Sequence, residues 1–279
     1  MRRRLPPYLA ILCLGLALSG YFAVRFPDVP GTGWASTVST LLIALPAMRG
    51  AIRRFGWRGA AVAIGLLAGL GFGVELTGVV TGFPYGEFYY SDSLGAKVAG
   101  LVPVTLPLSW VPLILGAVAA TEPRAMRRTR FGSTLWALAA AVLLVAVDSV
   151  LDPGAAHLGF WVWPHGGGYY GVPLTNYLGW ALSSVLAVGL LLAVLPWRRT
   201  EPVPAMLDSA LVSMAFWTAV ALFSGLWVPF VLGVCLFFTL IWRRASIAAT
   251  SRRKPKARWV QPFSPVAAAD STGQPLTRR

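Results

Sequence analysis

Three acidic residues of this chain stand in sequence that is otherwise apolar enough to lie inside a membrane. Glu75 falls in a hydrophobic run and shares one helical face with Ala68, Gly71 and Gly78. Small residues at this spacing mark faces where membrane helices pack closely, so we expect Glu75 to be buried between helices. An ionisable side chain in that position predicts a functional site, with a structural hydrogen bond to a neighbouring helix as the alternative.

Asp148 and Asp152 are spaced to share one face at the end of another hydrophobic run. Pro153 and Gly154 follow directly, and they predict that the helix ends there. The helix dipole disfavours a negative charge at this end, which favours the protonated form that a general acid needs. Asp152 can instead simply face water, an alternative that is weaker for Asp148.

Aromatic residues crowd two loops near these acids, and their faces can stabilise a cation. An aromatic belt at the membrane interface is the alternative, and it explains part of the clustering. Asn176 and Tyr170 are candidates for orienting a water or a carboxyl group. The predicted substrate-binding residues are Tyr85, Phe88 and Tyr89 in the first loop, Trp161, Trp163, Tyr169 and Tyr170 in the second, and Asn176, Trp180 and Trp110.

Metal and cofactor chemistry have weak support in the sequence. His157 and His165 are the only histidines, and with Asp152 they would form a facial metal triad. No ligand spacing on a recognisable element supports that triad. The G-L-G-F-G run at 69–73 lies inside a hydrophobic segment with no strand before it, so helix packing explains it better than nucleotide binding. We therefore predict neither a metal nor a cofactor.

The elements that position these residues are predicted to be membrane helices. The 279 residues are 56% hydrophobic and only 12% charged, whereas soluble domains average about 25% charged. Several apolar blocks reach the length of about 20 residues that crosses a bilayer. The net charge of +14 comes from arginines between these blocks and in the tail, which is typical of cytoplasmic loops and not of nucleic-acid binding. The predicted class is an all-α, polytopic integral membrane protein.

About eight transmembrane helices are expected within a domain of residues 1–242, followed by a basic tail at 243–279 that is predicted to be disordered and cytoplasmic. The first block is expected to be a retained helix, with a signal peptide as the alternative. Basic clusters alternate between the blocks, so the positive-inside rule places both termini in the cytoplasm of a plasma-membrane protein. The expected spans are 5–24, 34–52, 57–80, 101–120, 131–151, 174–195, 206–223 and 227–242.

Two stretches of the chain match at a constant offset. The pattern V-P-x-T occurs at 102–105 and at 172–175, and each copy is followed five residues later by a tryptophan. An aromatic loop and an acid precede both copies. This predicts a parallel two-helix repeat with units of about 57–120 and 131–195, against a chance match in a biased composition.

The stretch 148–180 contains D-x-x-x-D-P, W-x-W, G-x-Y-Y-G-V-P and N-x-x-G-W, and it resembles the carotenoid 1′,2′-hydratase family of bacteria and archaea. The T-G-F-P-Y-G-x-F-Y-Y at 81–90 and the P-L-S-W at 107–110 are similar to another block of that family. The resemblance implies addition of water to the end of an acyclic carotenoid such as lycopene or γ-carotene. It also implies a membrane-dissolved carotenoid, the lipid bilayer and other carotenoid-pathway enzymes as partners.

The acids suit this chemistry, which needs no redox cofactor. Our hypothesis is that protonated Asp148 or Glu75 protonates C2′, and that a tertiary cation forms at C1′ beside aromatic faces. Asp152, or the other acid of the pair, then activates a water. Three alternatives stay open: a carotene cyclase, a proton-coupled transporter with Glu75 and Asp148 as its relay, and a non-catalytic carotenoid- or lipid-binding protein.

Overall fold

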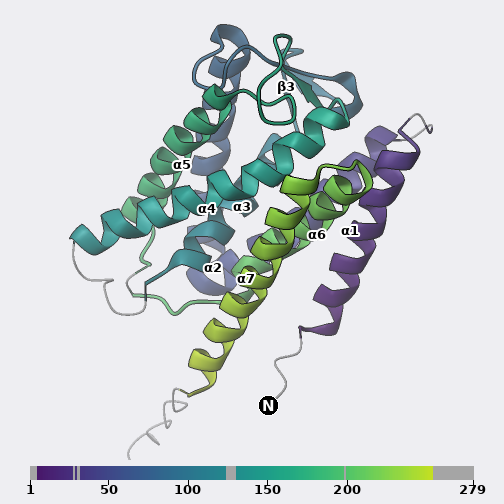
Figure 1. Cartoon of the computed structure of the whole chain (residues 1–279). Coiled ribbons are helices and arrows are strands. Elements are labelled where there is room, and N and C mark those ends of the chain that lie inside the picture. Colours follow the sequence, from purple (N-terminus) through teal and green to yellow (C-terminus); the bar gives the residue numbers. More distant parts are fainter. Residues whose placement is uncertain (1–4, 28, 30–31, 124–129, 198, 254–279) are drawn as a thin grey trace, which may run out of the picture.

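The computed structural model describes residues 5–27, 29, 32–123, 130–197 and 199–253, which are mostly helical (Figure 1). The all-α class is therefore confirmed. The basic residues 1–4, the arginines at 124, 127, 128 and 198, and the tail from residue 254 onward lie outside the described residues. The helices are α1 (Pro7–Arg25), α2 (Thr32–Thr81), α3 (Leu106–Thr121), α4 (Arg130–His157), α5 (Leu174–Val194), α6 (Asp208–Phe223) and α7 (Trp227–Arg253).

Six helices among the described residues are long and apolar enough to cross a membrane, and α3 is apolar but shorter. The count differs from the eight predicted spans because the blocks 34–52 and 57–80 continue into one another as α2. The block 101–120 becomes helical only from Leu106. At the other end of the chain, α7 continues to Arg253, so the helical part extends beyond the boundary predicted at residue 242.

Helix α2 bends at one residue and contains one proline. Gly56 has φ 74° and ψ 170°, which bends the helix, and Pro46 lies inside its first half. A proline inside a helix lacks the N–H that the helical ladder needs. The hydroxyl of Ser209, from α6, accepts the N–H of Ala47 at 2.8 Å and donates to the carbonyl of Ala44 at 3.2 Å. The neighbouring helix thus supplies partners for backbone groups beside Pro46.

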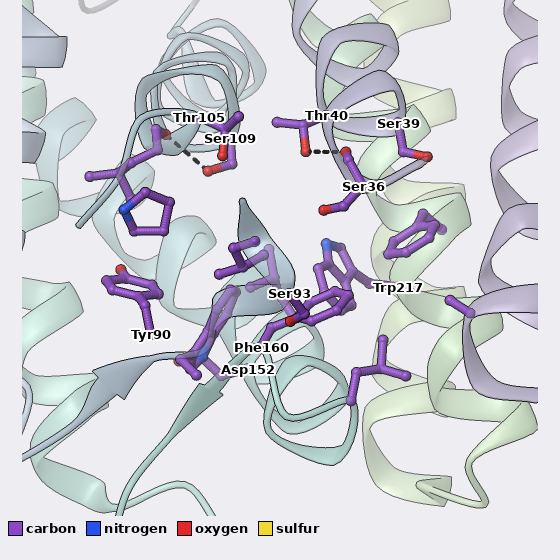
Figure 2. A pocket seen from close by; sticks show the side chains of 18 of the residues that line it. Ser36, Ser39, Thr40, Tyr90, Ser93, Thr105, Ser109, Asp152, Phe160 and Trp217 are labelled. Carbon is purple, nitrogen blue, oxygen red and sulfur yellow. Dashed lines mark hydrogen bonds between the residues drawn. The ribbon is translucent and has the colours of Figure 1, made fainter. Parts of the chain in front are cut away.

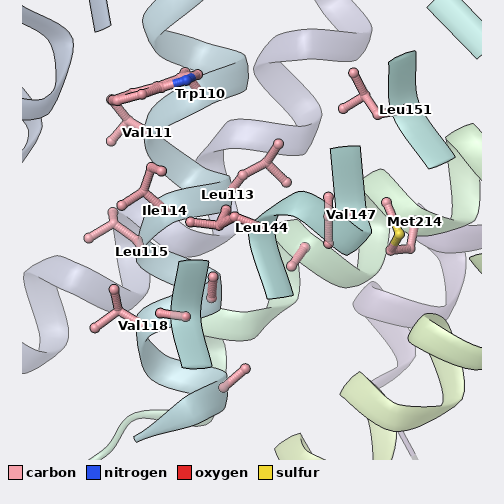
Figure 3. Close-up of a cluster of buried hydrophobic side chains, with 14 of the residues drawn as sticks. Trp110, Val111, Leu113, Ile114, Leu115, Val118, Leu144, Val147, Leu151 and Met214 are labelled. Carbon is pink, nitrogen blue, oxygen red and sulfur yellow. The ribbon is translucent and has the colours of Figure 1, made fainter. Parts of the chain in front are cut away.

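The core is centred on α3 and α6, which are buried on most of their surfaces. Figure 3 shows where α3, α4 and α6 meet, with Ile114, Leu144 and Met214 all at most 1% exposed. A side chain at Gly116 would place a Cβ only 3.1 Å from that of Ala210. Small residues therefore set the close approach of α3 to α6, as expected for helices packed in a membrane.

A buried ion pair fastens one end of the bundle. Both terminal guanidinium nitrogens of Arg54 donate to the carboxylate of Glu122, at 2.7 and 2.8 Å. The Arg54 guanidinium also lies 4.4 Å from the centre of the Trp197 ring. Arg243 of α7 donates to the carbonyls of Ala120 and Glu122. From the sequence, Arg54 is one of the arginines between hydrophobic blocks that predict a cytoplasmic loop, whereas its side chain is fully buried.

The loops after α2 and α4 meet at the opposite end. Strand β1 pairs antiparallel with β4, with Tyr89 opposite Val162 and Tyr90 opposite Trp161. The two aromatic loops are therefore joined directly by backbone hydrogen bonds. The short elements are β1 (Tyr89–Tyr90), the 3₁₀ turn η1 (Asp92–Leu94), β2 (Lys97–Val98) paired with β3 (Val102–Pro103), β4 (Trp161–Val162), and the 3₁₀ turn η2 (Pro204–Leu207) before α6.

The helix end predicted at Pro153 is wrong, because α4 continues to His157. Pro153 has no N–H to offer the carbonyl of Ser149, four residues earlier. The hydroxyl of Tyr169, from the following loop, donates to that carbonyl at 3.2 Å and replaces the missing donor. Both Asp148 and Asp152 consequently lie inside the helix and not in its last turn, so the predicted influence of the helix dipole does not apply to them.

Candidate active site

A cavity of about 580 Å³ lies between α1, α2, α3, α4, α5 and α6, next to the paired loops (Figure 2). Two of the three predicted acids, Glu75 and Asp152, line it together with Asn176. Aromatic rings make up a large part of the wall around these acids. Besides Phe22 and Phe26 at the end of α1, the rings are Tyr85, Phe88, Tyr90, Trp110, Phe160, Trp161, Trp163, Trp180, Phe216 and Trp217.

Glu75 lies on the small-residue face of α2 that the sequence predicted, and it is 5% exposed. Gly71 and Gly78 stand one turn before and one turn after it. A Cβ at Gly71 would lie 3.0 Å from the Trp110 ring, and one at Gly78 would lie 2.9 Å from the Tyr85 ring. The two glycines therefore make room for aromatic rings that enclose the carboxyl group, and the prediction that Glu75 is buried between helices is confirmed.

Tyr90 was not among the predicted binding residues, yet its hydroxyl donates to Oε2 of Glu75 at 2.8 Å. Burial, together with the charge of Glu75, raises the pKa of Tyr90 well above its ordinary value, so the phenol keeps its proton and acts as the donor. Lys97 holds the backbone at this point, because its Nζ donates to the carbonyl of Tyr90 and to Oδ1 of Asp92, both at 2.7 Å.

Asp148 and Asp152 are 1% and 2% exposed, so Asp152 does not face water. Nδ2 of Asn176 donates to Oδ2 of Asp148 at 3.1 Å and also to Oδ2 of Asp152. One side-chain amide nitrogen carries two hydrogens, enough for one bond to each carboxyl group. Nε1 of Trp161 donates to Oδ1 of Asp152 at 3.2 Å, whereas Oδ1 of Asp148 is buried with no hydrogen-bond partner. Asp152 thus faces the cavity, and Asp148 is not part of its lining.

Three of the predicted aromatic residues do not line this cavity. The side chain of Tyr89 is half exposed, on the face of β1 opposite to Tyr90. Tyr169 bonds to α4 as described above, and the hydroxyl of Tyr170 accepts the backbone N–H of Val228 at the start of α7, at 3.4 Å. Helix α6, to which the sequence analysis assigned no site residue, contributes Trp217 to the wall.

Sequence comparison with known proteins identifies the family of this chain. Residues 31–240 match the family of carotenoid biosynthesis proteins. This chain belongs to that family. It is 38% identical over 210 residues, or 72% of this chain and 70% of the relative, to a protein named bisanhydrobacterioruberin hydratase from Haloarcula japonica. No solved structure matches the chain. The family resemblance drawn from the sequence motifs is therefore confirmed.

The two histidines of this carotenoid biosynthesis protein lie apart from Glu75, Asp148 and Asp152. His157 is exposed at the end of α4, and Nε2 of His165 lies 3.3 Å from Oε2 of Glu87 on the surface. Within the described parts of the chain, no group of three or more His, Cys, Asp or Glu side chains is placed to hold a metal ion. The facial triad considered from the sequence does not assemble.

Proposed function

We propose that this protein adds water across the terminal C1′,2′ double bond of an acyclic carotenoid end of the lycopene or γ-carotene type, giving a tertiary alcohol at C1′. One observation carries the proposal: buried Glu75 and Asp152 face a single aromatic cavity in a carotenoid biosynthesis protein. The name of the similar protein, a hydratase, supports the same reaction class. A substrate dissolved in the membrane is consistent with a cavity among apolar helices.

The proton donor in this proposal is Asp152, backed by Asp148. Two carboxyl groups bridged by one amide, that of Asn176, repel each other when both are charged. This arrangement favours one proton shared by the pair. Because only Asp152 lines the cavity, it delivers the proton to C2′, and Asp148 acts by holding and positioning that proton.

Protonation of C2′ leaves a tertiary cation at C1′. The faces of Trp161, Trp163 and Phe88 line the cavity and can stabilise this charge. Aromatic walls also keep bulk water away from the cation, so that a positioned water adds to it.

Glu75 serves as the base. In this proposal a water donates a hydrogen bond to the Glu75 carboxylate, whose Oε2 already accepts one from Tyr90. The water oxygen forms the new bond to C1′ and passes one proton to Glu75. The two acid sites then have exchanged protonation states, and return of one proton to Asp152 completes the cycle.

The membrane arrangement belongs to the same proposal. A straight helix with the 50 residues of α2 would be about 75 Å long, more than twice the hydrocarbon core of about 30 Å. We propose that α2 crosses twice and turns at Gly56, which with α3 gives eight crossings. Arg49, Arg53 and Arg58 near this turn support a cytoplasmic location for it in the plasma membrane, with both termini on the same side.

The internal repeat is also part of the proposal. The pairing of Tyr90 with Trp161 joins equivalent loops, and the rings of Trp110 and Trp180, which match at the repeat offset, lie 6.3 Å apart. Both contacts support two parallel helix–loop–helix units that face each other across the acid site.

Expression of the chain in cells that accumulate lycopene tests the proposed function, with pigments analysed by mass. A product heavier by one water supports hydration. An unchanged pigment profile, with the protein verified in the membrane, overturns it. A product that is cyclic and has no added oxygen would indicate a carotene cyclase, the second candidate, which the same cation-stabilising cavity would serve.

A further inference from the structure

The cavity extends well beyond the carboxyl groups, toward the end of α1 and the start of α2. Phe22 and Phe26 of α1 line it there, although they are 57% and 50% exposed. Side chains that belong both to the cavity wall and to the outer surface mark an opening. Figure 2 shows Ser36 and Ser39 grouped on α2 at this end, away from Asp152.

Helices α1 and α2 border this opening, and α1 contacts both α6 and α2. Helix α1 packs closely on α6, since a Cβ at Gly20 would lie 2.9 Å from the Phe216 carbonyl and 3.2 Å from the Cβ of Ala219. Toward α2, the hydroxyls of Ser19 and Ser39 approach each other to 3.5 Å across the seam. The α1–α2 seam is thus lined by the small polar side chains of Ser19 and Ser39 and, on α1, by the rings of Phe22 and Phe26.

We propose that this opening, bordered by Phe22 and Phe26 of α1 and by Ser36 and Ser39 of α2, is the side port through which the polyene chain of an acyclic carotenoid enters. The inference rests on the proposed function. A carotenoid is about as long as the hydrocarbon core of the bilayer, about 30 Å. In this proposal the end group reaches the acids while the remaining chain lies in the port and in lipid.

The rings of Phe22 and Phe26 fit this occupant. They stack at 5.9 Å with an interplanar angle of 30°, one helical turn apart. The two rings place apolar aromatic surface along the edge of the opening, against which a polyene can pack. A compact polar ligand would gain nothing from such a surface.

Locking the α1–α2 seam with a disulfide that can be reduced again tests the assignment. Ser19→Cys with Ser39→Cys, in a background with Cys13→Ala and Cys235→Ala, places two thiols across the seam. Oxidation to the disulfide should abolish formation of the water-added product in lycopene-containing membranes, and reduction should restore it. Each single-cysteine variant should be unaffected by oxidant. Full activity with the disulfide verified by mass overturns the port.

A bulky substitution gives an independent test. Ser36→Trp fills the opening from α2, whereas Val38→Trp on the same helix points to the outside, since Val38 is 51% exposed and does not line the cavity. We expect the first variant to lose most of its activity and the second to keep it. Equal activity of the two variants overturns the port.

Failure of the port and failure of the proposed function give different results. Lycopene that stays bound to the purified parent protein reports entry without turnover. Bound lycopene without any water-added product overturns hydration alone. Lycopene bound equally by the parent, by Ser36→Trp and by the oxidised double-cysteine variant overturns the port alone.

Discussion

The hydroxyl of Tyr90 donates a hydrogen bond of 2.8 Å to the carboxylate of Glu75, across 15 positions of sequence. The bond joins the loop strand β1 to the cavity wall on α2. It holds the carboxyl group of Glu75 in one orientation. The loop is thereby part of the acid site and not only its cover.

Glu75→Gln should reduce hydration by about 10²- to 10⁴-fold, the usual contribution of a positioned general base. Tyr90→Phe should cost about 10- to 100-fold, because a hydrogen bond to a charged group contributes about 1.5–3 kcal/mol. The measurement is the amount of water-added carotenoid per amount of membrane protein. Tyr89→Phe is the matched control, since the exposed side chain of Tyr89 does not line the cavity, and it should retain full activity.

The two effects should not add, since Tyr90 acts through Glu75. The double variant Glu75→Gln/Tyr90→Phe should be no less active than Glu75→Gln alone. If Tyr90→Phe lowered activity by the same factor in both backgrounds, Tyr90 would act on something other than Glu75.

Asn176→Ala removes the amide that bridges two buried carboxyl groups. We expect it to lower the free energy of unfolding by about 1–3 kcal/mol, the cost of leaving buried polar groups without partners, and to lower hydration activity as well. Ser184→Ala, on the same helix, is the control. Its hydroxyl is buried without a hydrogen-bond partner, so its removal loses no hydrogen bond and should leave the free energy of unfolding equal or higher.

Thermal unfolding of the purified variants in detergent measures this difference. An Asn176→Ala protein as stable and as active as the parent would show that the bridge is not needed. A larger loss for Ser184→Ala than for Asn176→Ala would contradict the hydrogen bonding described for α5.

Gly179 is a sharper test of how the first loop is seated. A Cβ there would lie 2.5 Å from the Tyr85 ring and 2.8 Å from the carbonyl of Pro84. Gly179→Ala should therefore push this loop away from the acids and lower activity. Gly189→Ala on the same helix meets nothing within 4 Å and should leave activity unchanged. Hydration is assayed in membranes that contain equal amounts of each variant. Equal activities of the two variants would contradict the close packing at Gly179.

Tyr169 and Pro153 make a pair that a double-mutant cycle can resolve. Tyr169→Phe removes the donor to the Ser149 carbonyl, which should cost about 1–3 kcal/mol of stability. In a Pro153→Ala background, the new backbone N–H can bond to that same carbonyl, so Tyr169→Phe should then cost much less. Thermal unfolding of the four proteins measures the coupling. An equal cost in both backgrounds would assign the effect of Tyr169 to its ring packing.

The sequence predicted the membrane class, the buried acid on α2 and the two aromatic loops, since each follows from local composition and spacing. It named Tyr89 and not Tyr90 as a binding residue, whereas Tyr90 is the one that lines the cavity. Side chains alternate along a strand, and only the pairing of β1 with β4 decides which tyrosine faces inward. The same limit applies to Trp217, whose helix is buried at most positions and has no apolar stripe that marks the face that reaches the cavity.

The end of α4 was mispredicted because a tertiary contact stabilises the helix beyond Pro153. Pro153 is a sound local signal for a helix end, and it was overruled by a hydroxyl from Tyr169 in the following loop. Arg54 shows the same limitation, because a positive charge beside other arginines predicts a surface cluster. Its partner, Glu122, lies 68 positions further along the chain, and the pair is buried. Contacts of this range are not readable from local patterns.

The hydrogen bonds that Ser209 makes beside Pro46 have a consequence for how the protein folds during its synthesis. Ala47 and Ser209 are 162 positions apart, so the first part of α2 is synthesised long before its partner on α6 exists. During that interval, the backbone groups around Pro46 need a substitute in the bilayer, such as a water or the insertion machinery. Arrival of α6 then releases the substitute, so completion of the N-terminal half depends on the C-terminal half having been translated.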